Sequence, residues 1–293
     1  MAVNICPKPF YDRINDIDTR RVSHDTNSWV RHDVKYADRR RFVSELALGH
    51  EIGRPVPRVS YTNEEHAVWS RLMNRLTEDD LLHRTACDPY LANLDYLGYD
   101  HRDKKIPQIA DVSNAIEKRT GWRIRPVSGA LRPREFLGGL AFRHFHSPLH
   151  VRHPTEHTTF PEPDVCHTLV AHAPMLADRC FADFLECLGK ASLFADAKEL
   201  WHLTKLYYHV LEYGVIRQGE TIKAFGPGVL GDPDVLASLT SINNKPETAN
   251  VVSFDPFATR LKSHSQLEFF VVDTFEDAQL MMQEYGENLV KCS

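Results

Sequence analysis

The chain has 293 residues, 42% of them hydrophobic, which is enough to bury a sizeable core in one large domain or two modest ones. Its formal net charge of −5 provides no general attraction for nucleic acid or for an anionic membrane. The sequence shows no signal peptide, no apolar run that could span a membrane, and six cysteines without metal-motif or disulfide-framework spacing. We therefore expect a cytoplasmic protein with free thiols and with neither nucleic acid nor membrane as a partner.

Residues 1–50 are rich in Asp, Arg and Asn and show little apolar periodicity. This composition predicts an arm that is loosely ordered or draped over a main body at 51–293. The first strong helix signal follows, because Thr62 and Glu65 have the spacing of a capping box. The helix that they begin carries one apolar stripe, formed by Val68, Trp69, Leu72, Met73 and Leu76.

Helices dominate the elements that follow in chain order. We expect a helix over 111–121 ending at Gly121, a strand over 122–127, a helix over 181–189, a longer helix over about 195–213 ending at Gly214, a strand over 267–272 and a helix over 275–285. This pattern predicts a mainly α fold with a few short β-strands, of the α+β class.

The longer helix carries two rows of side chains. Its apolar stripe is formed by Leu200, Leu203, Leu206, Tyr207 and Val210. A second row, with members four residues apart, is formed by Thr204, Tyr208 and Glu212. This row is either the solvent-exposed face, or a second buried face that points Glu212 into a cavity. The helix alone leaves both interpretations open.

Two histidines stand close together in PEPDVCHTLVAH, residues 161–172. His167 and His172 are five residues apart, which corresponds to about 140° of rotation on an ideal helix. Both imidazoles can therefore reach one metal ion only if the helix begins at the first histidine or is locally distorted. Two imidazoles and a carboxylate from a separate helix form the facial triad that binds non-haem Fe(II). With sixteen histidines and forty acidic residues, composition alone does not select these three ligands.

Longer motifs lie around these residues: IPQIADVSNAIEKRTGWRIRPVSGAL (106–131), REFLGGLAFRHFH (134–146), VRH (151–153), PEPDVCHTLVAHAPMLADRCFADF (161–184), LYYHVLEYGVIRQGETIKAFGPGVL (206–230) and DTFEDA (273–278). Through them the chain closely resembles the catalytic domain of the pterin-dependent aromatic amino acid hydroxylases, which comprise the phenylalanine, tyrosine and tryptophan hydroxylases. The likeness extends weakly upstream to about residue 55. The family's regulatory domain and tetramerisation helix are not evident, as in its short bacterial members, so the resemblance implies a monomer or weak oligomer.

The resemblance implies a mostly helical, single-domain catalytic fold at 51–293 that encloses a deep, iron-containing cleft. It implies that His167, His172 and Glu212 bind Fe(II). Arg152 would bind the carboxylate of an amino acid substrate through its guanidinium fork, and Asp164, at a helix N-cap position, would orient it. Tetrahydrobiopterin or a related tetrahydropterin would supply two electrons, with O₂ as co-substrate. The residues expected beside the pterin are Phe136, Gly129, Leu131, Thr168, Thr204 and Tyr207.

Five residues of the expected site depart from the family pattern. Thr168 replaces a glutamate, and Thr204 an alanine, on the pterin side. Phe160 replaces a threonine, Gly231 a serine, and Tyr208 a Trp or Phe, on the amino acid side. Together they predict a pocket with an altered shape and fewer hydroxyl contacts.

We expect an enzyme that hydroxylates the ring of phenylalanine to a tyrosine, at the para or the meta position, in a specialised biosynthetic pathway. Hydroxylation of tryptophan or tyrosine is one alternative. The other is a non-catalytic descendant that binds an amino acid or a pterin.

Overall fold

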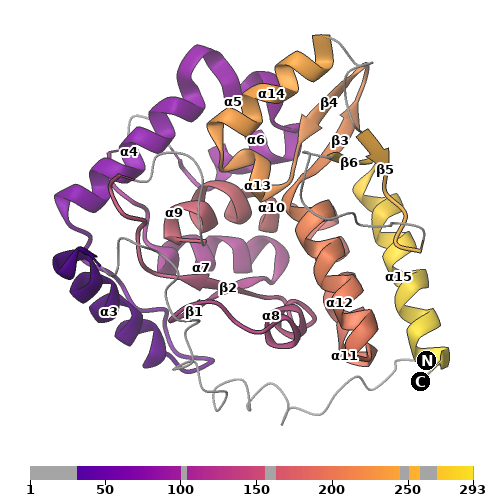
Figure 1. Ribbon diagram of the computed structural model, residues 1–293, viewed down its shortest axis with the longest axis horizontal. Helices are drawn as coiled ribbons and strands as arrows, with labels where there is room; N and C mark the ends of the chain where they lie inside the picture. The colour runs from indigo at the N-terminus through magenta and orange to yellow at the C-terminus, as the bar shows by residue number, and fades with distance from the viewer. Residues whose placement is uncertain (1–31, 100–103, 156–162, 245–250, 258–268, 293) are drawn as a thin grey trace.

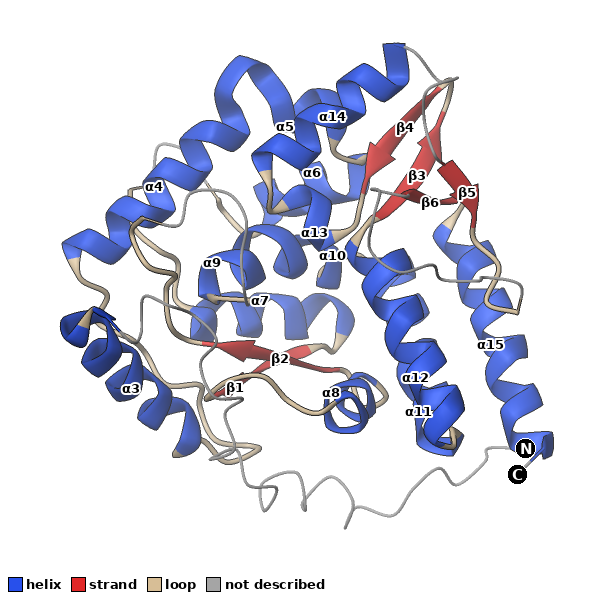
Figure 2. Cartoon of the chain, viewed as in Figure 1, coloured by secondary structure: helices blue, strands red, loops and turns tan. Residues whose placement is uncertain are grey.

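The computed structural model describes residues 32–99, 104–155, 163–244, 251–257 and 269–292. Their fold is mainly helical, as predicted, with one small sheet among the helices and a second sheet at the edge of the molecule (Figure 1, Figure 2). The helices are α3 (Val34–Leu48), α4 (Asn63–Thr77), η1 (Glu78–Asp80), α5 (Leu81–Thr85), α6 (Asp88–Tyr96), α7 (Ile109–Thr120), α8 (Pro133–Leu140), α9 (Val165–His167), η2 (Thr168–His172), α10 (Ala173–Leu176), α11 (Arg179–Phe194), α12 (Ala197–Leu206), η3 (Tyr207–Glu212), α13 (Pro227–Leu230), α14 (Pro233–Asn244) and α15 (Phe275–Cys292).

The strands form two separate sheets. In the first, β1 (Arg123–Val127) pairs in parallel with β2 (His144–Pro148). The second has the order β4–β3–β6–β5, formed by β4 (Thr221–Ala224), β3 (Gly214–Gln218), β6 (Phe269–Val272) and β5 (Val251–Ser253). Strands β1 and β6 confirm the predicted strands, although residues 267 and 268 lie outside the described residues. The others, three to five residues long, were not predicted.

The predicted helices α4, α7, α11 and α12 each have an apolar face, whereas the amphipathic α8 was not predicted. The capping box of α4 is formed: the Thr62 hydroxyl accepts from the Glu65 N–H, and the Glu65 carboxylate accepts from the Thr62 N–H. The predicted stripe of α4 is buried in the core. Helix α7 ends at Gly121, which adopts a left-handed conformation with φ of 78°. Glycine adopts this conformation without the steric cost of a Cβ.

Helix α3 falls within the arm expected over residues 1–50. It packs on the body through Val43 and Ala47, and the Tyr36 hydroxyl donates to the carbonyl of Val151 over 3.1 Å. The sequence analysis did not predict this helix, because its buried residues include the charged Arg40 and form no apolar stripe. The arm's remaining residues, 1–31, lie outside the described residues.

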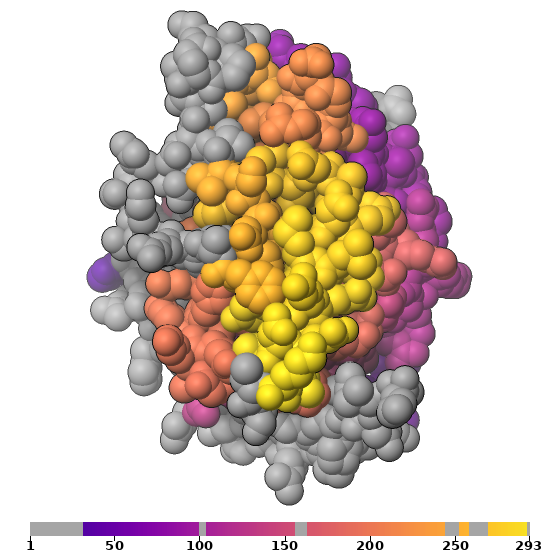
Figure 3. Space-filling view, turned by 90° about the vertical axis from the view of Figure 1, so that its right-hand side faces the viewer, coloured from indigo at the N-terminus to yellow at the C-terminus, as the bar shows by residue number. Residues whose placement is uncertain are grey.

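Helices α11, α12 and α15 lie side by side at one end of the molecule (Figure 1), and α15 crosses the surface there (Figure 3). At the crossing of α11 and α15, Gly286 faces Ala191 with room for a Cβ at 3.5 Å. None of the helices in the described part of the chain is long and apolar enough to cross a membrane.

Two helices change their winding where the expected site lies. Helix α9 passes directly into the π-helical segment η2, and α12 passes into the π-helical segment η3. The helix predicted over 195–213 therefore exists, but its last turn is π-helical. The segment ends at Glu212 with Tyr213 as its C-cap, and the predicted stop residue, Gly214, begins β3. π-Helical turns are rare and are found frequently at functional sites.

A side chain at Gly214 would disturb this junction. An added Cβ would lie 2.1 Å from the carbonyl oxygen of Val210 and 2.2 Å from Cζ of Phe225. We expect Gly214→Ala to lower the free energy of unfolding by about 3 kcal/mol through overpacking. The matched control is Gly286→Ala, which should be neutral or stabilise the helix by roughly 0.5–1 kcal/mol. Urea unfolding followed by circular dichroism compares them, and equal midpoints would contradict the packing argument.

Candidate metal and substrate site

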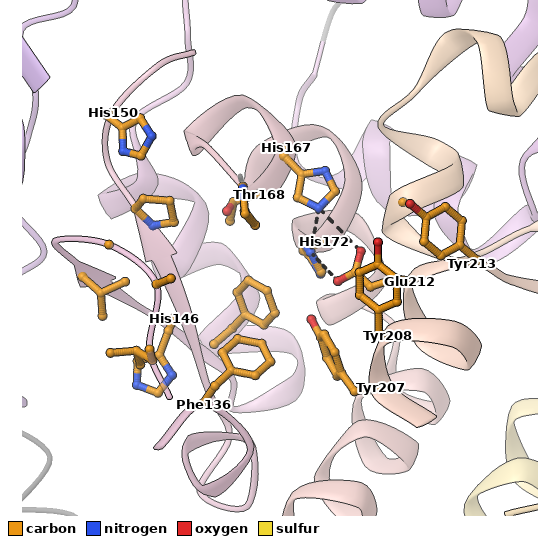
Figure 4. Close-up of a pocket in the computed structure, with 18 of the residues that line it drawn as sticks. Phe136, His146, His150, His167, Thr168, His172, Tyr207, Tyr208, Glu212 and Tyr213 are labelled. Carbon is orange, nitrogen blue, oxygen red and sulfur yellow. Dashed lines mark hydrogen bonds and ion pairs between the residues drawn. The ribbon is translucent and has the colours of Figure 1, made fainter. Parts of the chain in front are cut away.

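A cavity of about 370 Å³ lies between the β1–β2 sheet and the two π-helical segments (Figure 4). Its volume is in the range of sites for small molecules. The lining residues are Val127, Gly129, Ala130, Leu131, Phe136, Phe145, His146, Pro148, His150, Pro163, His167, Thr168, His172, Tyr207, Tyr208, Glu212, Tyr213, Gly228 and Asp232.

Three of these side chains converge on one point (Figure 4). The Nε2 atoms of His167 and His172 are 3.1 Å apart. The carboxylate of Glu212 lies 3.7 Å from Nε2 of His167 and 3.4 Å from Nε2 of His172. Two ligand atoms at right angles around a divalent metal, with bonds of about 2.1 Å, lie roughly 3 Å apart, so the three side chains can surround one ion. Within the described residues, no other group of His, Cys, Asp and Glu side chains meets this condition.

The π-helical winding explains how residues five apart can share a face. A π-helix joins residues i and i+5 by its hydrogen bonds, so His167 and His172 lie above one another. The same spacing separates Tyr207 from Glu212 in η3, and the Tyr207 hydroxyl hydrogen-bonds the Glu212 carboxylate. In the second row of this helix, Glu212 points into the cavity, whereas Tyr208 is 42% exposed and Thr204 does not line the cavity, so the row as a whole is not a second buried face.

The protonation states in the site favour metal binding. Burial lowers the pKa of His172, and the neighbouring His167 lowers it further, although Glu212 opposes the shift. For Glu212, burial alone would raise the pKa of the carboxyl, but the two imidazoles and the Tyr207 hydroxyl outweigh burial and lower it. A neutral imidazole and an ionised carboxylate are the forms that coordinate a metal.

Asp164 connects the first ligand to Arg152. Its carboxylate accepts the backbone N–H of His167 at 2.8 Å as the N-cap of α9, and the backbone N–H of Arg152 at 2.9 Å. It also accepts from Nε and Nη2 of the Arg152 guanidinium at 2.9 and 2.8 Å. Burial raises the pKa of Asp164, but the charge and hydrogen bonds of Arg152 overcome this and lower it to about 2. The two side chains form a buried ion pair.

Most residues expected beside the pterin line the cavity. Phe136 packs edge-on against Tyr207, with ring centroids 4.9 Å apart, and against Phe145 at 5.9 Å. Thr168 is buried, and its hydroxyl accepts from the Ser147 hydroxyl at 2.8 Å. Gly129 and Leu131 line the cavity as well, and so does Tyr208, which was expected on the amino acid side.

Four expected residues do not line the cavity, and a fifth cannot be placed. Arg152 and Asp164 lie behind its wall, and the Thr204 hydroxyl donates to the carbonyl of Leu200 in its own helix. Gly231 contacts the site indirectly, because a Cβ there would lie 2.9 Å from Nδ1 of His167. The remaining residue, Phe160, lies outside the described residues.

The cavity also contains polar residues that the sequence analysis did not select: His146, His150, Tyr213 and Asp232. Neither ring nitrogen of His146 has a hydrogen-bond partner among the described residues, and burial lowers its pKa to about 3. Tyr213 hydrogen-bonds Tyr208, and the two ring centroids are 5.5 Å apart. Tyr213 directly follows Glu212 in the sequence, and this position was the one local feature that could have indicated its place in the cavity wall.

The cysteines whose side chains are described, Cys87, Cys166, Cys180 and Cys187, are all free thiols. Cys166 directly precedes His167 and is fully buried. Burial raises its pKa well above the ordinary value, and the nearby Asp164 carboxylate acts in the same direction. This thiol is therefore protonated at neutral pH.

Known proteins resemble this chain in sequence and structure. The family described as "Biopterin-dependent aromatic amino acid hydroxylase" matches residues 10–292. The chloroplastic phenylalanine 4-monooxygenase of Chlamydomonas reinhardtii is 40% identical over 262 residues, which cover 88% of this chain and 70% of that protein. Tyrosine 3-monooxygenase of Canis lupus familiaris is 38% identical over 265 residues, covering 88% of this chain and 52% of that protein. The crystal structure of Chromobacterium violaceum phenylalanine hydroxylase with bound iron(III) and 7,8-dihydrobiopterin has a TM-score of 0.71 at 28% identity, covering 87% of this chain and 92% of that one.

The buried ion pair has a consequence for stability. We expect Asp164→Asn to lower the free energy of unfolding of the metal-free protein by about 3–5 kcal/mol, because it leaves the Arg152 guanidinium buried without its counter-charge. The control is Asp273→Asn, which removes an exposed ion pair with Arg217 and should cost less than about 1 kcal/mol. Denaturant titration at neutral pH measures both, and similar costs would contradict the role of burial.

The same pair predicts a pH dependence. The pKa of Asp164 in the folded state is about 2, below the ordinary value of 3.8. The stabilisation is therefore present in full above pH 3.8 and is lost as the pH falls to about 2. In this window, unfolding titrations should show a smaller loss of stability for Asp164→Asn than for the unaltered protein.

Proposed function

Because this chain belongs to the biopterin-dependent aromatic amino acid hydroxylases, we propose that His167, His172 and Glu212 bind one ferrous iron and that the substrate is phenylalanine. The protein is a pterin-dependent aromatic amino acid monooxygenase that uses iron and a biopterin. The observation that carries the iron assignment is the convergence of two imidazole nitrogens and one carboxylate oxygen within 4.8 Å of one another.

The donor set fits iron. Imidazole and carboxylate suit a borderline divalent ion, and three protein ligands leave up to three positions of an octahedral ion open. These positions adjoin the cavity, because all three ligands are among its lining residues. An ion bound there would be accessible from the cavity without displacement of a protein ligand.

The chain's own residues would bind and orient the reactants. When bound, iron and tetrahydropterin supply the activation of oxygen and the two electrons for hydroxylation. The ring of Phe136, held edge-on by Tyr207 and Phe145, offers a flat apolar surface for the pterin. The Thr168 hydroxyl, fixed by Ser147, presents a neutral group where the family pattern has a carboxylate. We therefore assign this side of the cavity to the pterin.

The amino acid side is assigned to the aromatic wall of Tyr208 and Tyr213 and, from the family resemblance, to Arg152, which is buried and does not line the cavity itself. Asp164 holds Arg152 in a set position relative to His167, which supports binding of the substrate carboxylate at a fixed distance from the iron. Phenylalanine is favoured because the relatives from Chlamydomonas and Chromobacterium are named for it. The hydroxyl group enters at the para or the meta carbon, since a shift of about 1 Å in ring position changes which carbon is attacked. A meta product would suit a specialised biosynthetic pathway.

The iron site can be tested independently of activity. We expect the anaerobically reconstituted protein to retain about one iron per chain after gel filtration, as measured by elemental analysis. His167→Ala should lose the iron because one of the three ligands is removed. His83→Ala, which alters an exposed histidine, is the control and should retain it. Equal iron contents in the two variants would refute the assignment.

The reaction is tested by incubating the holoenzyme with tetrahydropterin, O₂ and each aromatic amino acid in turn. We expect consumption of pterin coupled to hydroxylation with phenylalanine, and mass spectrometry with NMR identifies the ring position of the product. If tyrosine or tryptophan alone is hydroxylated, the substrate assignment is wrong while the reaction class stands.

Tyr213 provides a test of the amino acid wall. We expect Tyr213→Phe to lower kcat/KM for phenylalanine about tenfold and to change the ratio of ring positions hydroxylated, because the Tyr208 ring loses its hydrogen bond. Iron content should be unchanged. Tyr96→Phe, which removes an exposed hydroxyl bonded to the Ala115 carbonyl, is the control. Unaltered kinetics and product ratio in Tyr213→Phe would remove the wall from the specificity argument.

A further inference from the structure

The carboxylate of Asp232 lines the cavity of the candidate site, and neither the iron nor the pterin assignment uses it. Asp232 follows Gly231 in the short turn between α13 and α14. It is 7% exposed and so more than nine-tenths buried, yet it borders the space that the substrate would occupy. A buried carboxylate is costly unless a positive charge or hydrogen-bond donors compensate for it.

The fold holds one of the two carboxylate oxygens of Asp232. Oδ1 accepts the backbone N–H of Asp234 at 2.9 Å and that of Val235 at 3.2 Å, both in the first turn of α14. In the described part of the chain, no group donates a hydrogen bond to Oδ2. The two backbone bonds therefore fix the side chain, and Oδ2 is the oxygen that remains to accept a hydrogen bond from a ligand in the cavity.

Positive charge is scarce around this carboxylate. The described lining of the cavity contains two acidic side chains, Glu212 and Asp232, and neither lysine nor arginine. The guanidinium of Arg75 acts on Asp232, but its Nη2 atom bonds the Asp234 carboxylate at 2.6 Å. Burial raises the pKa of Asp232, and the backbone donors and Arg75 offset this only in part. The proposed iron would balance Glu212, whereas Asp232 has no comparable partner in the cavity lining.

The position of Asp232 is tied to the proposed iron site. A Cβ on the preceding residue, Gly231, would lie 2.9 Å from Nδ1 of His167, so the chain passes directly beside this ligand. Burial raises the pKa of Tyr213, and the negative charges of Glu212 and Asp232 raise it further, which places both carboxylates near the same phenol. Asp232 therefore belongs to the wall that the amino acid substrate is expected to contact.

We propose that Oδ2 of Asp232 binds the α-ammonium group of the amino acid substrate, an inference that rests on the proposed function. An ammonium group supplies what this carboxylate lacks, namely a full positive charge and a strong hydrogen-bond donor. In phenylalanine the ammonium is the one cationic group, because the ring carries no charge. Asp232 would thus select for an amino acid over an aromatic acid without an amino group.

An ammonium held at Asp232 would also limit where the substrate ring can lie. It would fix the α-carbon on the side of the cavity that contains His167, and a single methylene group joins this carbon to the ring. A shift of about 1 Å in ring position changes which ring carbon is attacked. Asp232 would therefore contribute to the choice of ring position as well as to affinity.

Binding is tested with Asp232→Asn in the full chain, loaded with ferrous iron and kept anaerobic without pterin, so that no turnover occurs. Asparagine keeps an oxygen that can accept the two backbone N–H groups but removes the negative charge. Titration calorimetry compares L-phenylalanine with 3-phenylpropanoate, which has the same ring and carboxylate without the ammonium. We expect the variant to bind phenylalanine about 10- to 100-fold more weakly, and to bind phenylpropanoate no more weakly than the unaltered protein does.

The matched control is Asp178→Asn. The Asp178 carboxylate accepts the backbone N–H of Phe181 at 2.9 Å at the start of α11, and Asp178 is not among the described lining residues of the cavity. This variant should leave both dissociation constants unchanged. In turnover with tetrahydropterin and O₂, Asp232→Asn should raise KM for phenylalanine by a larger factor than it lowers kcat, because it removes a contact made in the bound substrate.

Equal weakening of both ligands by Asp232→Asn would overturn the proposal, because it would show that the residue acts through the start of α14 alone. An unchanged affinity for phenylalanine in a variant that still hydroxylates it would also overturn the proposal and would leave the proposed function intact. If the unaltered protein neither binds nor hydroxylates phenylalanine, the proposed function and this inference fail together.

Discussion

The buried contact between Asp164 and Arg152 is the interaction on which the candidate site depends. One carboxylate accepts three hydrogen bonds from Arg152 and one from the backbone N–H of His167, in the first turn of the helix that carries this ligand. Because the carboxylate is fully buried, water cannot replace a lost donor. The helix start and the arginine are therefore held in one geometry. Iron ligation and recognition of the substrate carboxylate, in the proposed function, both rely on this single group.

Local signals made part of the fold predictable. Helix α4 could be located because its capping box and its apolar stripe lie within a few residues of each other in the sequence. Helix α3 could not, since Arg40 is buried together with Val43 and Ala47 and no amphipathic pattern results. The strands β2, β3, β4 and β5 are short, and their pairing depends on partners that a local pattern does not identify.

The types of the candidate metal ligands could be predicted from the sequence, but the local backbone geometry that brings them together could not. The spacing of His167 and His172 required an irregular helix, and η2 meets the requirement by π-helical winding. The spacing could not tell this solution from a helix that begins at the first histidine. Glu212 was selected through family resemblance, because its own helix left two interpretations open. Asp232 and His150 escaped attention because only the tertiary fold brings them to the cavity wall.

The thiol of Cys166 lies next to a proposed iron ligand, and its protonation state decides whether it would react with the iron or with oxidants. It is adjacent in sequence to a proposed ferrous ligand, yet burial and a neighbouring negative charge keep it in the unreactive SH form. Thiolates, not thiols, coordinate metals and react with oxidants. An oxygen-consuming centre can thus have sulfur beside it without losing iron to that sulfur or converting it to sulfenic acid. Thiol-alkylating reagents would likewise leave Cys166 unmodified as long as the protein remains folded.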